Sequence, residues 1–193
     1  LSMAGWVLDL PRLSNWMGDG LATQPNSALA AIGIGVGMLL VVLGRSVAAA
    51  VVAAIVAAVG ALTALENLSG ADFGIDAWLL FGREWGTAGT LAPGRMGLPA
   101  SVSWTVLGAS LFLIARRPPR LKVWAPWLAL LPLAISLLSL LGFAYDAGQL
   151  YTVPGVTAIS MQTALGIFAL SFATISLADA GPSTVFGNPG PAG

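Results

Sequence analysis

The stretch Val47–Leu65, which reads VAAAVVAAIVAAVGALTAL, decides the fold because no charged side chain interrupts it. As an α-helix that rises about 1.5 Å per residue, it reaches about 28 Å, close to the thickness of a bilayer's hydrocarbon core. Ser27–Gly44, Val123–Phe143 and Gly155–Ala178 are equally free of charge, and a shorter apolar block covers Ala100–Ala115. We therefore predict five transmembrane helices.

The composition indicates a membrane protein of the helical class. Of the 193 residues, 57% are hydrophobic and 8% are charged, whereas about a quarter of the residues of a soluble domain carry a charge. The apolar blocks lack the alternation of a transmembrane β-strand, so their backbone groups must pair within helices. The sequence thus predicts an all-α, polytopic transmembrane helix bundle.

Charge balance and missing residue types remove several classes of function. Eight basic residues offset eight acidic ones, which argues against nucleic-acid binding. The sequence contains neither cysteine nor histidine, so disulfides, thiolate chemistry and histidine ligation of haem are excluded. It also shows no phosphate-binding loop and no nucleophile–base pair. We predict no enzymatic activity, no metal site and no evident cofactor, with lipid or pigment as non-protein contacts.

The positions of the basic residues predict the topology. Arg45 lies in one short connection between apolar blocks, and a second connection, RRPPRLK, carries four more basic residues between Arg116 and Lys122. Because positive charge in short loops favours the cytoplasm, both connections are expected on the cytoplasmic side of a bacterial inner membrane. The acidic connections, 68–98 and 144–154, then lie outside. The protein is expected to be multi-pass with a cytoplasmic C-terminal tail.

These assignments divide the chain into three parts. Residues 1–25 are expected to hold an outer loop and, in the apolar segment Leu1–Leu8, the outer end of a sixth span. Residues 26–178 form the five-helix transmembrane domain, in which 68–98 is an interfacial loop. Residues 179–193 are rich in Gly and Pro and are expected to form a flexible cytoplasmic tail.

The helices that run inward begin with a recurring pattern, which predicts that the bundle is built from repeated helical hairpins. The three starts are Pro25-Asn26-Ser27-Ala28, Pro99-Ala100-Ser101-Val102 and Met161-Gln162-Thr163-Ala164. Asn26, Ser101 and Thr163 are expected to cap the exposed N–H groups of their helices.

Glu66 is the acidic residue closest to a predicted span. Buried charge is costly in a bilayer, so one interpretation is a proton or cation site that faces the bundle interior. The other is an interfacial acid that bonds to a neighbouring loop, and we favour it because Glu66 lies in the last turn of its block.

The outer loop 68–98 mixes aromatic and charged residues. We single out Trp78, Phe81, Arg83, Trp85 and Arg95. Tryptophan is favoured at headgroup depth, so anchoring of the loop in the interface is the expected role. The alternative is a pocket beneath the loop, where aromatic residues and Arg83 or Arg95 would meet an apolar or anionic ligand.

Small residues in the first two blocks predict close helix packing. Gly33 and Gly37 lie in the first block, and a ridge of alanines runs along the second. The alanines of this ridge are Ala50, Ala54, Ala57 and Ala61. These residues would pack either within the chain or against another membrane subunit, and the sequence leaves both alternatives open.

Two segments of the outer loop carry a resemblance to a known family. Gly74-Ile75-Asp76 is followed by Pro93-Gly94-Arg95-Met96 and then by an inward helix, and the recurring helix starts accompany them. Over residues 1–178 this pattern resembles the membrane-embedded N-terminal sensor region of bacterial histidine kinases and diguanylate cyclases. The resemblance implies a module that senses an envelope signal and passes it inward, here without an output domain after Ala178.

Two functions follow from these observations. The first is a non-catalytic, sensor-like membrane module that acts through helix packing and partner binding, with membrane lipids and either other transmembrane subunits or a second copy as partners. The alternative is an accessory structural subunit of a larger bacterial membrane complex, photosynthetic or respiratory. A small transporter is a weaker alternative, because the spans contain few buried polar groups.

Overall fold

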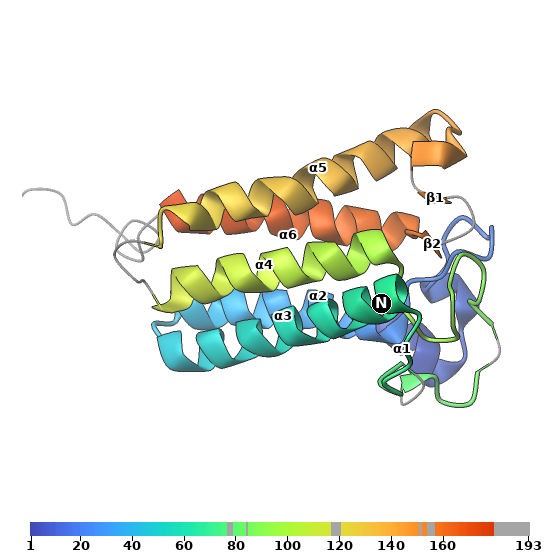
Figure 1. The fold of residues 1–193 in the computed structure, drawn as a ribbon, viewed down its shortest axis with the longest axis horizontal. Helices are drawn as coiled ribbons and strands as arrows, with labels where there is room; N and C mark the ends of the chain where they lie inside the picture. Colours follow the sequence, from blue (N-terminus) through green and yellow to red (C-terminus); the bar gives the residue numbers. More distant parts are fainter. Residues whose placement is uncertain (77–78, 84, 117–120, 151, 154–156, 180–193) are drawn as a thin grey trace, which may run out of the picture.

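The computed structural model describes residues 1–76, 79–83, 85–116, 121–150, 152–153 and 157–179. It confirms the predicted all-α bundle: five helices long and apolar enough to cross a membrane run side by side (Figure 1). These helices are α2 (Pro25–Val42), α3 (Ser46–Ser69), α4 (Leu98–Arg116), α5 (Trp124–Ala144) and α6 (Met161–Asp179). The protein is therefore a multi-pass membrane protein.

The shorter elements gather at one end of the bundle, on the right in Figure 1, which we call the loop end. They are α1 (Ser2–Leu8), the 3₁₀ helices η1 (Pro11–Leu13) and η3 (Gly148–Leu150), and the antiparallel strands β1 (Thr152–Val153) and β2 (Thr157–Ala158). The opposite end holds the start of α3 after Arg45, the end of α4 at Arg116 and the start of α5 after Lys122, and we call it the basic end.

The last helix begins at the recurring helix start. The predicted apolar block runs from Gly155, but α6 begins at Met161, the first residue of the recurring pattern. Thr157 and Ala158 form β2 instead, and the N–H of Ala158 donates to the carbonyl oxygen of Gly89 at 2.9 Å. Because that pairing gives the backbone an extended partner, the apolar residues before Met161 stay out of the helix.

Three helices form the centre of the bundle, and two helices pack against them. Helices α2, α4 and α6 contact one another, while α3 lies against α2 and α4, and α5 lies against α4 and α6. Apolar side chains of α2, α4 and α6 fill the centre, and Ile34, Leu107, Leu111 and Ile167 are fully buried there. This arrangement brings the loop-end starts of α2, α4 and α6 together.

The closest helix contact joins α3 and α4 and depends on two glycines. A Cβ added at Gly108 would lie 2.6 Å from the backbone nitrogen of Ala57, and one added at Gly60 would lie 2.7 Å from that of Thr105. Real Cβ atoms do not approach backbone so closely, so these glycines set the distance between the helices. We call this contact the glycine seam.

Gly33 and Gly37 also pack within the chain. A Cβ at Gly33 would meet Val56 of α3 at 2.6 Å, and one at Gly37 would meet Leu111 of α4 at 2.7 Å. Both glycines therefore allow neighbouring side chains to reach the backbone of α2.

The alanines of the predicted ridge on α3 do not all pack within the chain. Ala50 is buried, and Ala57 packs against Gly108, but Ala54 is exposed and Ala61 is half-buried. The buried face instead runs through Ala53, Val56 and Gly60. Gly60 allows the nearest approach of α4, so the face centred on Gly60 turns inward and Ala54 turns outward.

Candidate functional site

Buried charge at the loop end is concentrated around Arg95. Its Nε donates to Oδ2 of Asp76 at 2.7 Å, and its Nη2 lies 3.5 Å from Oδ1 of Asp72 and 3.6 Å from Oε1 of Glu66. Glu66 is fully buried, and Asp76 and Arg95 are each 5% exposed. We call these four residues, together with Asn26, the Arg95 cluster.

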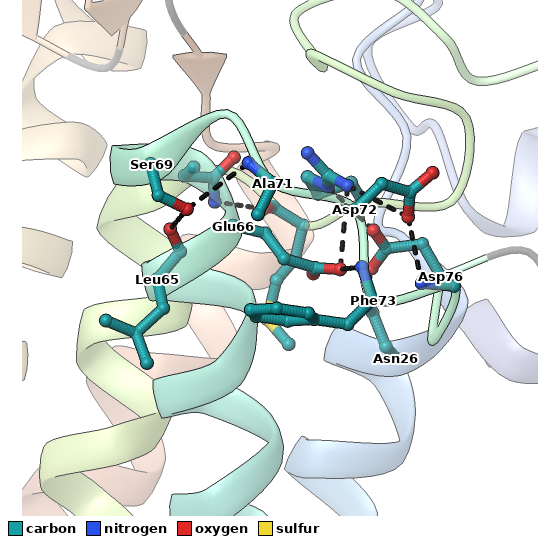
Figure 2. A network of polar contacts seen from close by, with 12 residues as sticks. Asn26, Leu65, Glu66, Ser69, Ala71, Asp72, Phe73 and Asp76 are labelled. Atoms are coloured by element: carbon teal, nitrogen blue, oxygen red, sulfur yellow. Dashed lines mark hydrogen bonds and ion pairs between the residues drawn. The ribbon is translucent and has the colours of Figure 1, made fainter.

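The cluster joins three segments that are distant in sequence (Figure 2). Glu66 lies in the last turn of α3, and Asn26 lies in the first turn of α2. Nδ2 of Asn26 donates to Oδ1 of Asp76 at 3.2 Å. Arg95 comes from the outer loop just before α4. The cluster therefore ties the loop-end termini of α2 and α3 to the loop that leads into α4.

Local backbone geometry explains why Glu66 faces the loop. Helix α3 ends at Ser69, and the next residue, Gly70, has a φ of 71°, in the left-handed region that glycine adopts at helix ends. The chain then turns back, and the N–H of Phe73 donates to Oε1 of Glu66 at 2.7 Å. Glu66 thus bonds to a neighbouring loop and also contacts Arg95, as Figure 2 shows for its contact with Phe73.

Gly94 places Arg95 against Asp76. Its φ is 79°, and a side chain at this position would overlap the carbonyl group of Asp76. On the other side of the segment, Nδ2 of Asn67 donates to the carbonyl oxygen of Met96 at 3.1 Å. A glycine is therefore required before Arg95 if the guanidinium is to reach the buried carboxylates.

The cluster holds more acidic than basic groups. Glu66, Asp72 and Asp76 each offer an oxygen, and these oxygens lie within 4.8 Å of one another. That spacing would suit a metal ion, but the guanidinium of Arg95 contacts all three carboxylates and supplies positive charge at the same place. Oε2 of Glu66 is buried and has no hydrogen-bond partner among the described residues. Three carboxylates thus surround one guanidinium, so the cluster has a net negative charge unless one carboxylate is protonated.

The burial and the net negative charge of the cluster affect the pKa of Asp76. Burial raises the pKa of Asp76 above its usual 3.8; the hydrogen bond from Arg95 opposes this effect, and the negative charge of Glu66 adds to it. The pKa of Arg95 is raised, because the hydrogen bond and charge of Asp76 outweigh the desolvation of the guanidinium. Asp76 consequently takes up a proton at a higher pH than an aspartate in water does.

Replacing Asp76 by asparagine (D76N) should remove a pH-dependent part of the stability. The pKa of Asp76 is higher in the folded than in the unfolded protein, so the folded state holds more protons as the pH rises from about 3.8 to the raised value. Within that window the stability contributed by Asp76 falls with rising pH. The free energy of unfolding of the wild type minus that of D76N should therefore decrease as the pH rises through the window. A difference that stayed constant or increased would contradict the assignment.

The other predicted loop residues contact α1 and its end. Nη1 of Arg83 lies 3.1 Å from Oδ2 of Asp9, and Nε1 of Trp85 donates to Oδ1 of the same residue at 2.9 Å. The ring of Trp85 stacks on that of Trp6 at a centroid distance of 4.0 Å. Phe81 is exposed, and Trp78 lies outside the described residues. Both arginines named from the sequence therefore have acidic partners within the chain.

A cavity does lie beneath the loop, but its lining differs from the expected one. Its volume is about 230 Å³, and neither Arg83, Arg95 nor an aromatic side chain lines it in the described part of the chain. The residues that line it include Asn26, Leu29, Val59, Ile75 and Leu79. The cavity thus adjoins the Arg95 cluster through Asn26 and through Ile75, the neighbour of Asp76.

The three predicted caps make different hydrogen bonds. Oδ1 of Asn26 accepts from the N–H of Ser27 in the first turn of α2 at 2.9 Å. Oγ of Ser27 accepts a hydrogen bond from Nε1 of Trp104 at 2.8 Å, and Ser101 donates to the carbonyl oxygen of Leu98. The hydroxyl of Thr163 instead joins a second cluster. The predicted capping role is therefore wrong for Ser101, whose hydroxyl donates to a carbonyl instead of accepting from an N–H. It is also wrong for Thr163, whose hydroxyl bonds to other hydroxyls while Oγ of Ser160 accepts from the N–H of Thr163 at 3.4 Å.

A second polar cluster consists of three buried hydroxyls. Oγ1 of Thr23 lies 2.9 Å from Oγ of Ser160 and 3.2 Å from Oγ1 of Thr163, and the last two lie 2.9 Å apart. We call them the hydroxyl triad. It joins the segment before α2 to the start of α6.

Comparison of the chain with protein-family models, with curated proteins and with solved structures found no match.

Proposed function

We propose that the protein is a non-catalytic sensor module in which the Arg95 cluster receives a signal at the loop end and the helices carry it to the basic end. The observation behind this proposal is that one buried ionic network joins α2, α3 and the loop before α4. A change in charge within the cluster therefore acts on three of the five spans at once. The resemblance to sensor regions of signalling proteins agrees with such a role.

The energetics of the cluster favour a responsive element over a purely structural one. Buried ion pairs contribute little net stability, because the desolvation of their charges offsets their attraction. Here two buried carboxylates share one buried guanidinium, so one acidic group remains undercompensated. Binding of a proton, or of another positive ligand, would relieve this imbalance and change the contacts of Asp76.

The proposal also includes an orientation. Five of the eight basic residues lie at the basic end or in its connections, and seven of the eight acidic residues lie elsewhere. By the positive-inside rule, the basic end faces the cytoplasm and the loop end faces outward in a bacterial inner membrane. An impermeant thiol reagent applied to intact cells should label a cysteine at Leu91 and spare one at Leu43.

Pulsed electron paramagnetic resonance in nanodiscs tests the transmission. The chain has no native cysteine, so spin labels can be attached solely at L43C, at the end of α2, and V123C, before α5. Both positions are exposed and belong to the basic end. We expect D76N to shift the distance between the labels by about 2 Å, the size of typical helix displacements in switching proteins.

A matched control is available at the same end of the molecule. D9N removes one charge from the exposed pair of Asp9 and Arg83 and should leave the label distance unchanged. Identical distance distributions for the wild type and D76N would overturn the sensor proposal. Stoichiometric copurification with a large membrane complex in mild detergent would then favour the accessory-subunit alternative.

A further inference from the structure

A groove opens between α5 and α6 at the basic end. Its volume is about 620 Å³. Its lining includes Lys122, Trp127 and Leu130 on the α5 side and Ile175 and Ala178 on α6. One end of the groove therefore carries a positive charge, and the rest is apolar and lies within the span of the helices.

The two parts of the groove match the two parts of a phospholipid. Lys122 precedes α5 and so lies outside its apolar span, and the groove continues from there past Leu130 and Ile175. Trp124 and Trp127 are both more than half exposed on α5, and tryptophan prefers the headgroup region. An acyl chain that follows the groove would thus place its phosphate beside Lys122.

The charge around the groove selects the headgroup. Arg116 ends α4 and Lys122 precedes α5, so both basic residues lie at the same end of the bundle as the groove. The last residue of α6, Asp179, is the sole acidic residue in this part of the sequence. Basic pockets between transmembrane helices attract anionic headgroups. A lipid with a net negative charge is therefore favoured over a zwitterionic one.

We propose that this groove is a binding site for an anionic phospholipid, with its phosphate at Lys122 and an acyl chain between α5 and α6. The site lies at the opposite end of the bundle from the Arg95 cluster and does not depend on a sensor function. It also lies at the entry to α5, so an occupied groove would hold α5 and α6 together.

Native mass spectrometry of the full chain in detergent tests the site. The probes are phosphatidylglycerol and phosphatidylcholine with the same acyl chains, added in equal amounts. We expect the wild type to retain phosphatidylglycerol in preference. K122Q should lower that preference about fivefold, since one basic residue near an anionic lipid surface is worth about that factor in affinity.

Two further variants separate a specific site from general charge attraction. R45Q removes the same charge at the same end, but Arg45 does not line the groove, so its preference should equal that of the wild type. I175W fills the apolar part and should reduce retention of phosphatidylglycerol although Lys122 remains. The proposal would be overturned if K122Q and R45Q lost the same preference for phosphatidylglycerol. It would also be overturned if neither K122Q nor I175W retained less phosphatidylglycerol than the wild type.

Discussion

Replacing Arg95 with glutamine is expected to lower the free energy of unfolding by about 3 kcal/mol or more. The change leaves Glu66 and Asp76 buried without their shared positive partner, and removal of one member of a buried ion pair typically costs about 3–5 kcal/mol. Asn26 would still donate to Asp76, but an amide cannot balance two carboxylates. Equilibrium unfolding in detergent, followed by circular dichroism, measures the loss.

The matched control for this variant is Arg83→Gln. Arg83 also pairs with an aspartate at the loop end, but its side chain is 29% exposed and that of its partner Asp9 is 51% exposed. Exposed pairs contribute at most about 1 kcal/mol, so this variant should unfold almost like the wild type. If both arginine variants lost the same stability, the Arg95 cluster would have no special energetic role.

Replacing Gly108 with valine should separate α3 from α4 and destabilise the bundle by about 3 kcal/mol. The first carbon of any side chain would lie 2.6 Å from the nitrogen of Ala57 and 2.8 Å from the carbonyl oxygen of Ala53. Those atoms belong to a helix backbone and cannot rotate away, so the added carbons force the helices apart. Overpacking of this kind costs about 1–3 kcal/mol even where side chains can adjust. Unfolding in detergent again measures the effect.

Gly35→Ala provides the comparison for the glycine seam. Gly35 also lies within a transmembrane helix, but a Cβ at this position would have no atom within 4 Å. Alanine favours the helix over glycine, so this variant should be as stable as the wild type or slightly more stable. A Gly108→Val protein as stable as Gly35→Ala would show that the seam tolerates separation.

The fold could be predicted because the bilayer leaves few choices. Val47–Leu65 contains no charge, and in a hydrocarbon environment a segment of that length satisfies its backbone only as a helix. The same reasoning placed α2, α4 and α5 within a few residues of their observed bounds. For α6 the apolar block alone extends too far, to Gly155, whereas the recurring helix start gives Met161. Ala158, which precedes that start, pairs with distant Gly89 instead.

The site was harder to predict because its contacts cross the sequence. Glu66 and Arg95 are candidate residues because of their charge, and Asp76 belongs to a segment of the family resemblance, but no sequence pattern predicts that an irregular loop folds Asp76 onto Arg95. Gly94 offered one usable signal, since a glycine directly before an arginine permits a close backbone approach. In α3, alanines lie on several faces of the helix. The face that packs against the rest of the bundle therefore could not be identified from the alanines without knowing where α4 lies.

The hydroxyl triad has a consequence for biosynthesis. Thr23 emerges from the ribosome long before Ser160 and Thr163, and four membrane spans are translated between them. The three hydroxyls can therefore meet solely after all of those spans have been inserted in the correct order and direction. Their hydrogen bonds are therefore among the last tertiary contacts to form. A completely inserted molecule contains them, and a molecule whose translation or insertion stopped early lacks them.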